Sequence, residues 1–138
     1  MPVRVKVEIK SKGRQITTTA LLNTGFTTPE PEVLLPKKLA EKLNLWPPPE
    51  NSILESINTA GGEVLSYIIP KSIEITVLAG ETSSKTIVCN TIVSMHEREV
   101  LLSDALIEEL EIEIISPKTG IWRFKGKPEE TSVKPEYW

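Results

Sequence analysis

The sequence predicts a mostly β domain with one or two short helices, and three observations support this prediction. Several segments alternate between apolar and polar residues, which is typical of half-buried strands. Turn signals that contain Gly or Pro separate these segments at short intervals. Only two stretches, 37–43 and 103–110, favour a helix. With 138 residues the chain fits one domain that is long enough to bury a core.

The first strands are expected to form a hairpin. Residues 3–9 alternate between apolar and charged side chains, and 15–22 is β-branched and then fully apolar. The stretch 11–14 lies between them and supplies a turn at Gly13. The second strand therefore delivers residues 23–25 to one end of the hairpin.

The first helix is expected to begin at Pro36, because the missing N–H of a proline is tolerated at the first helical position. Asn44 is a plausible C-terminal stop. Three consecutive prolines in 46–51 then require an extended connector. The apolar face of the helix is expected to consist of Leu39, Ala40 and Leu43.

The remaining elements continue the β pattern. Ser103 is a candidate N-cap for the second helix. The segment 125–138 is polar and contains prolines, so it is expected to be a loose tail or to be ordered only by a partner. The expected strands are a hairpin over 56–69 with a Gly-Gly turn, then 71–79, 84–95, 112–116 and 121–124.

Composition excludes several classes of function. The net charge is -3, and Lys and Arg are scattered among acids, which argues against a nucleic-acid partner. No apolar run reaches the roughly 18 residues of a membrane helix, and no signal peptide is evident, so a soluble cytoplasmic protein without a membrane partner is expected. His96 is the single histidine, and Cys89 lies within a β run, so neither a metal site nor a cysteine nucleophile is predicted.

One motif points to a function. The stretch Leu21–Gly25, Leu-Leu-Asn-Thr-Gly, resembles the hydrophobic pair and Asp-Thr-Gly loop of the retroviral-type, or retropepsin-like, aspartic proteases. The hairpin before it, the apolar run after it and the Gly61-Gly62 hairpin lie where that family has corresponding features. Residues 100–110 resemble the stretch that leads into the family's helix. The resemblance covers roughly residues 3–124, so 1–124 is assigned to a retropepsin-like domain and 125–138 to the tail.

The resemblance implies a closed β-barrel, active as a homodimer. Each chain supplies one catalytic loop, and two carboxylates share one proton across the two-fold axis. Thr24 would lock the two loops together, and Gly25 would allow a tight turn. The peptide would bind as an added strand beneath a flap, and no cofactor or metal is implied. The flap residues expected to contact substrate are Thr59, Ala60, Gly61 and Gly62.

Asn23 stands where the family has its catalytic Asp. An amide neither ionises nor passes a proton at working pH, and a homodimer would carry the change twice. General acid and general base catalysis each contribute roughly 10²–10⁴ in rate, so this chain is predicted to be an inactive copy of an aspartic endopeptidase. The change is either an engineered replacement or natural. Because Thr24, Gly25 and the flap glycines persist, we favour an engineered Asp-to-Asn change.

Two departures and two rival readings accompany the resemblance. The acid and arginine that form an ion pair in viral members are replaced by Thr27 and by the stretch 103–105, which favours a cellular or archaeal branch. The first rival is a natural, non-catalytic peptide-binding or dimerisation module with the same fold. The second is an unrelated small β-barrel in which Asn-Thr-Gly is only a turn. That rival predicts a monomer.

Overall fold

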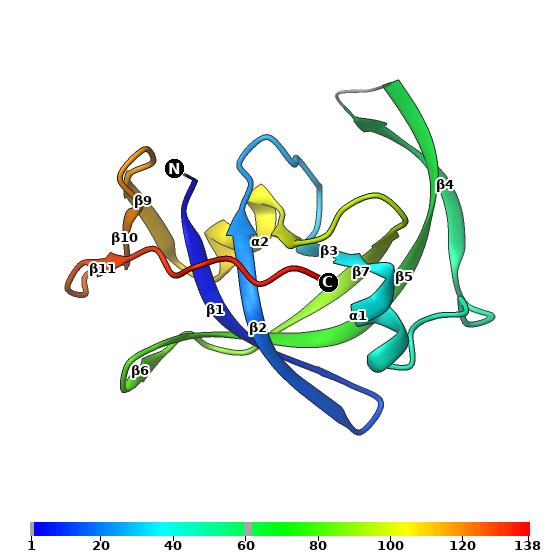
Figure 1. The fold of residues 1–138 in the computed structure, drawn as a ribbon, viewed down its shortest axis with the longest axis horizontal. Coiled ribbons are helices and arrows are strands. Elements are labelled where there is room, and N and C mark those ends of the chain that lie inside the picture. Colours follow the sequence, from blue (N-terminus) through cyan, green and yellow to red (C-terminus); the bar gives the residue numbers. More distant parts are fainter. Residues whose placement is uncertain (1, 60–61) are drawn as a thin grey trace.

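The computed structural model describes residues 2–59 and 62–138, and it is built mainly from β-strands (Figure 1). The strands are β1 (Arg4–Ser11), β2 (Arg14–Leu22), β3 (Glu32–Pro36), β4 (Ile53–Thr59), β5 (Gly62–Ala79), β6 (Thr82–Ser83), β7 (Ile87–Ser94), β8 (Val100–Leu102), β9 (Ile112–Ser116), β10 (Ile121–Phe124) and β11 (Glu130–Thr131). The helices of the described residues are α1 (Lys37–Lys42) and α2 (Asp104–Glu109). The prediction of a mostly β chain with one or two short helices is confirmed.

Six strands close into a barrel. Their order is β1–β2–β8–β3–β7–β5, and pairing of β5 with β1 closes the circle. The pairs β2–β8 and β3–β7 are parallel, and the other pairs in the barrel are antiparallel. A closed barrel has no free strand edge along its wall, so the strand ends and the attached loops can be held rigidly.

The predicted first hairpin is confirmed. β1 and β2 pair in register from Arg4–Leu21 to Ser11–Arg14. Gly13 adopts a φ of 77°, a left-handed conformation that favours glycine in the turn.

The first helix begins later than predicted. Pro36 is not helical: with φ -57° and ψ 145° it is the last residue of β3 and the N-cap of α1. Its extended conformation follows from the pairing of β3 with β7, which continues to Pro36–Ser94. The predicted apolar face is confirmed, since Leu39, Ala40 and Leu43 are fully buried. Asn44 has a φ of 60°, as expected of a helix stop.

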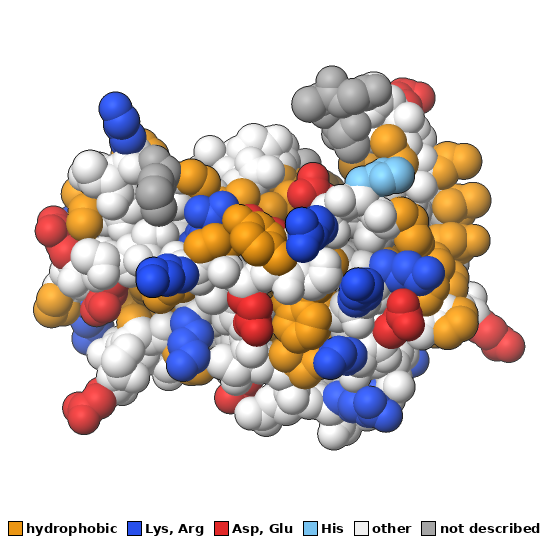
Figure 2. Space-filling model, viewed as in Figure 1, with side chains coloured by type: hydrophobic (Ala, Val, Ile, Leu, Met, Phe, Trp, Pro, Cys, Tyr) orange, Lys and Arg blue, Asp and Glu red, His pale blue; other side chains and the backbone are white. Residues whose placement is uncertain are grey.

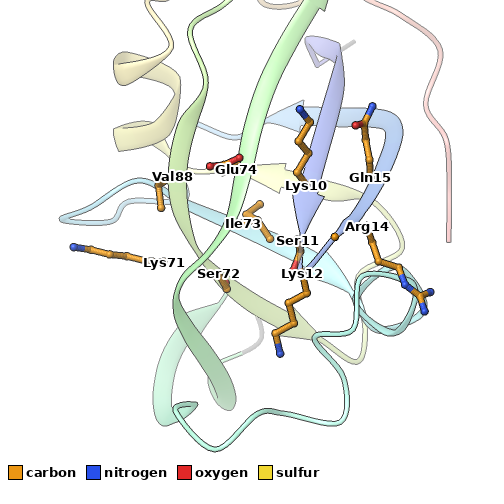
Figure 3. Close-up of a pocket in the computed structure, with 11 residues that line it drawn as sticks. Lys10, Ser11, Lys12, Arg14, Gln15, Lys71, Ser72, Ile73, Glu74 and Val88 are labelled. Atoms are coloured by element: carbon orange, nitrogen blue, oxygen red, sulfur yellow. The ribbon is translucent and has the colours of Figure 1, made fainter.

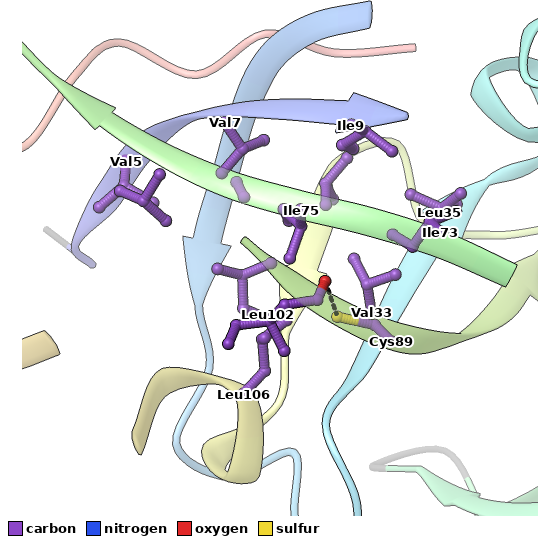
Figure 4. Packing of buried hydrophobic residues seen from close by; sticks show 14 of the residues in the cluster. Val5, Val7, Ile9, Val33, Leu35, Ile73, Ile75, Cys89, Leu102 and Leu106 are labelled. Carbon is purple, nitrogen blue, oxygen red and sulfur yellow. Dashed lines mark hydrogen bonds between the residues drawn. The ribbon is translucent and has the colours of Figure 1, made fainter. Parts of the chain in front are cut away.

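The core fills the inside of the barrel. Alternate residues of β1 and β5 point inward, among them Val5, Val7 and Ile75, all fully buried (Figure 4). Leu106 of α2 packs against the same cluster and covers one end of the barrel. This continuous core holds the ends of the strands, where the connecting loops start.

Strand β5 extends beyond the barrel. Its first half, beginning at Gly62, pairs with β4 in a hairpin that projects away from the barrel (Figure 1). A register shift between Ile69 and Ile73 separates this half from the half within the barrel. At the base of the hairpin Trp46 meets Tyr67 edge-on, with ring centroids 5.8 Å apart. The predicted hairpin is therefore present as β4 and β5, and its tip lies outside the described residues.

The C-terminal segment contradicts the expectation of a loose tail. β11 joins β10 and β9 in a three-stranded sheet, and the chain then runs across β1 and β2 towards α1 (Figure 1). The Val133 N–H donates to the Arg4 carbonyl at 3.0 Å, and Thr18 donates to Glu136 at 2.6 Å. The Trp138 indole donates to Thr18 at 3.1 Å. Composition did not reveal these contacts, because each one is polar and joins residues that are distant in sequence.

None of the helices in the described part of the chain is long and apolar enough to cross a membrane.

Candidate active site

The loop that carries the Asn-Thr-Gly motif starts where β2 leaves the barrel. Leu22 pairs with Leu102 of the parallel strand β8, and the Asn23 N–H donates to the Leu102 carbonyl at 3.2 Å. Phe26 N–H then donates to the Asn23 carbonyl at 3.0 Å and closes a turn. β8 therefore fixes the backbone of Asn23.

The side chain of Asn23 is part of this turn. Its Oδ1 accepts a hydrogen bond from the Gly25 N–H at 3.1 Å. A Cβ atom at position 25 would lie 3.3 Å from the same oxygen, so the close approach favours glycine there. Asn23 is half-buried, whereas Thr24 and Gly25 are exposed on this single chain. The structure thus brings the three motif residues together in one ordered turn.

The N-terminus of α2 anchors the rest of the loop. Asp104 accepts from the Thr28 N–H at 3.0 Å, and its own N–H donates to the Phe26 carbonyl at 2.9 Å. Ser103, fully buried, caps α2 by accepting from the Leu106 N–H at 3.2 Å. Its Oγ also accepts from the Glu32 N–H at 3.1 Å. Sequence analysis identified the cap but not its second role, which depends on the fold.

These contacts lie at the two places where sequence analysis found the acid and the arginine of the viral ion pair replaced. Asp104 reaches the loop from α2 and bonds to the backbone at Thr28, whereas Thr27 is exposed. Loop and helix are therefore joined without an arginine.

A cleft of about 660 Å³ lies beside the motif. One wall is the loop after Gly25, another is the inner face of the β4–β5 hairpin, and β7 contributes Asn90 and Ile92. The hairpin residues that line the cleft are Ile53, Glu55, Ser56, Ile57 and Ile68. This arrangement leaves room for an extended segment between the motif loop and the hairpin.

Of the predicted substrate-binding residues, Thr59 and Gly62 belong to the hairpin. Thr59 ends β4, and Gly62 begins β5 with a φ of 107°. Ala60 and Gly61 lie outside the described residues. The described lining of the cleft includes hairpin positions nearer the barrel, which sequence analysis did not identify. Their alternation, Ile53, Glu55 and Ile57, was the available signal, because residues two apart share one face of a strand.

Three of the described residues that line the cleft are acidic: Glu30, Glu32 and Glu55. Glu32, at the start of β3, is only 8% exposed, and its carboxylate accepts from the Asn90 amide at 3.5 Å. Burial raises the pKa of Glu32, and the hydrogen bond from Asn90 lowers it by less. The negative charges of Glu55 and Glu30 raise this pKa further.

A second cavity, of about 640 Å³, lies at the β1–β2 turn, and four basic side chains are among the residues that line it. The side chains of Lys10, Lys12 and Lys71 point in different directions (Figure 3). Lys12 and Arg14 are engaged with backbone carbonyls of residues 44 and 42, both at 3.3 Å. The cations therefore do not converge on one ligand.

Neither Cys89 nor His96 is among the described residues that line the cleft beside the motif. Cys89 is 1% exposed, and burial raises the pKa of its thiol to about 12, which keeps it protonated and unreactive. His96 is exposed. Among the described residues, no group of three His, Cys, Asp or Glu side chains is placed to hold a metal ion.

No protein-family model matches this chain, and a search of curated proteins finds no match either.

Proposed function

We propose that this chain is an aspartic endopeptidase of the retropepsin-like type, inactive as written because Asn23 replaces the catalytic Asp. The observation that carries the proposal is the position of the Asn-Thr-Gly turn. It follows β2 directly, is fixed by β8, and opens through Gly25 onto a cleft with a projecting hairpin as one wall.

The chemistry requires a second copy of the loop. Hydrolysis would use one ionised carboxylate to deprotonate water and one protonated carboxylate to donate a proton to the peptide carbonyl. A single chain supplies one such position, so the active unit is a two-fold homodimer with residue 23 of each chain at the axis. The exposure of Thr24 and Gly25 in the single chain is compatible with a partner loop packing there.

The cleft supports an extended peptide as the substrate. The hairpin presents apolar Ile53, Ile57 and Ile68 towards the cleft, which suits aliphatic side chains. The substrate would be bound between the motif loop and the hairpin, and water activated at the axis would attack its backbone.

The identity of residue 23 supports a second candidate, a natural module that binds peptides or dimerises without catalysis. An amide at this position retains the hydrogen bond to Gly25 but cannot titrate. Both candidates predict a dimer, and they differ in what restoring the acid does.

The decisive experiment is proteolysis of an unfolded protein by the Asn23→Asp variant across a range of pH. We expect the variant to cleave with a bell-shaped pH profile, and the parent chain and Asn23→Ala to show no turnover. Loss of both acid–base roles accounts for a difference of roughly 10⁴ or more in rate. A folded, dimeric Asn23→Asp variant that cleaves nothing would exclude the protease and leave the binding module.

Sedimentation of the parent chain tests the assembly separately. A homodimer is expected. A strictly monomeric chain at all concentrations would contradict both candidates and favour the unrelated barrel.

A further inference from the structure

We propose that the cleft beside the motif binds a basic side chain, Lys or Arg, of the peptide, with Glu32 as its main recognition group. This inference rests on the proposed function, because it assigns a substrate class to the same cleft. It goes beyond that function in naming a residue of the substrate.

The first argument is the state of the Glu32 carboxylate. The residue is 8% exposed, yet it lines the cleft. One oxygen accepts a long hydrogen bond of 3.5 Å from Asn90. No other described residue donates a hydrogen bond or forms an ion pair to this carboxylate, which lines the cleft. Burying a carboxylate is costly unless a donor or cation compensates it.

The second argument is the arrangement of charge around Glu32. Glu55 reaches the cleft from β4 and Glu30 from the motif loop, so carboxylates lie on two separate walls. The negative charges of both residues raise the pKa of Glu32. Lys71 is the single cation among the lining residues, and it forms no ion pair with these acids. The lining therefore has a net negative charge.

The third argument is that the backbone holds Glu32 in place. Its N–H donates to the Oγ of Ser103, and its carbonyl accepts from the Ser103 N–H, both at 3.1 Å. Asn90 is in turn fixed by the Lys71 N–H, which donates to its Oδ1 at 2.9 Å. A preorganised acceptor gains more from a ligand cation than a mobile surface carboxylate does.

An organic cation fits these observations better than a metal ion. The described residues contain no group of three ligands placed to hold a metal. The apolar hairpin residues Ile53, Ile57 and Ile68 line the same cleft and would contact the aliphatic stem of a lysine or arginine. Its charged head would then meet Glu32, with Glu55 and Glu30 nearby.

The test measures binding by the parent chain, which retains its cleft and is predicted not to cleave. Short fluorescent peptides of Val, Thr and Ala carry one guest residue stepped along the sequence, either Lys, norleucine or Glu. Anisotropy titrations give the dissociation constants. We expect Lys at one position to bind at least about tenfold more tightly than norleucine there, and Glu to bind most weakly.

Two variants locate the effect. Glu32→Gln keeps the shape and the acceptor for Asn90 but removes the charge, so it should reduce the Lys preference to near unity while norleucine peptides bind as before. The control, Glu81→Gln, lies in an exposed turn away from the cleft and should leave the preference unchanged.

The outcomes separate this inference from the proposed function. Equal binding of Lys and norleucine peptides, or a Lys preference that survives in Glu32→Gln, overturns the basic-side-chain inference and leaves the peptide cleft standing. Failure of every peptide to bind, together with an inert Asn23→Asp variant, overturns both.

Discussion

Strand β5 belongs to two regions that differ in side-chain burial and in strand pairing. Within the barrel, Ile75 and Val77 are fully buried and the strand pairs on both sides, with β1 and β7. In the hairpin, Leu65 is 67% exposed and its stretch of strand pairs only with β4. Hydrophobic side chains gather along the outer edge of this hairpin (Figure 2).

The comparison shows that the barrel and the hairpin have different sources of order. The barrel is stabilised by burial of its inner face, whereas an isolated two-stranded ribbon is only marginally stable in water. We therefore expect the hairpin to open at a lower free energy than the barrel. Because the cleft is built from both regions, we expect one of its walls to be rigid and the other to be more mobile.

The largest predicted effect compares two residues of this one strand. Ile75→Ala should lower the free energy of unfolding by about 2–5 kcal/mol, because it leaves a cavity in the core. Leu65→Ala should change it by no more than about 0.5 kcal/mol. Urea denaturation at one fixed protein concentration measures both. Equal losses would show that hairpin and barrel form a single packed unit.

A smaller effect tests the anchor between barrel and motif loop. Ser103→Ala removes the α2 cap and leaves the buried N–H of Glu32 without its acceptor, so a loss of about 2 kcal/mol is expected. Ser83→Ala, in an exposed segment, is the matched control. Hydrogen exchange should become faster in the motif loop and remain unchanged in β4. Acceleration confined to β4 would contradict the assignment of this anchor to the barrel side.

The smallest effect is a pH dependence that comes from the barrel wall of the cleft. Because the folded chain raises the pKa of Glu32, it binds that proton more tightly than the unfolded chain does. The resulting stability is full below the ordinary glutamate pKa of 4.5 and is lost as pH rises through the folded value. Relative to the parent, Glu32→Gln should therefore gain stability with increasing pH across this window. A difference that does not vary with pH would show that the carboxyl is not buried in solution.

Sequence reasoning predicted the parts of the fold that depend on local pattern. The alternation in β1, the apolar face of α1 and the cap at Ser103 are confirmed, because each is encoded by residues close together in the chain. The motif turn at Asn23 could be located for the same reason. Its assignment to a protease stays a prediction.

The parts that were missed depend on residues brought together from distant positions. Pro36 was assigned to a helix because its pairing with Ser94 is invisible to local pattern. The tail was expected to be loose, because its bonds to Arg4 and Thr18 span more than 100 residues. Glu32 was not identified, because only the pairing of β3 with β7 places it beside Asn90.

The irregularity in β5 has a mechanical consequence. Between Ile69 and Ile73 the regular ladder is interrupted, Lys71 adopts a φ of 43°, and Ser72 bonds across to Thr91 at 2.7 Å. The hairpin is attached to the barrel at this interruption. A small rotation at residues 69–73 displaces the distant part of the hairpin more than the part near the barrel. These residues therefore set the angle between the hairpin and the barrel.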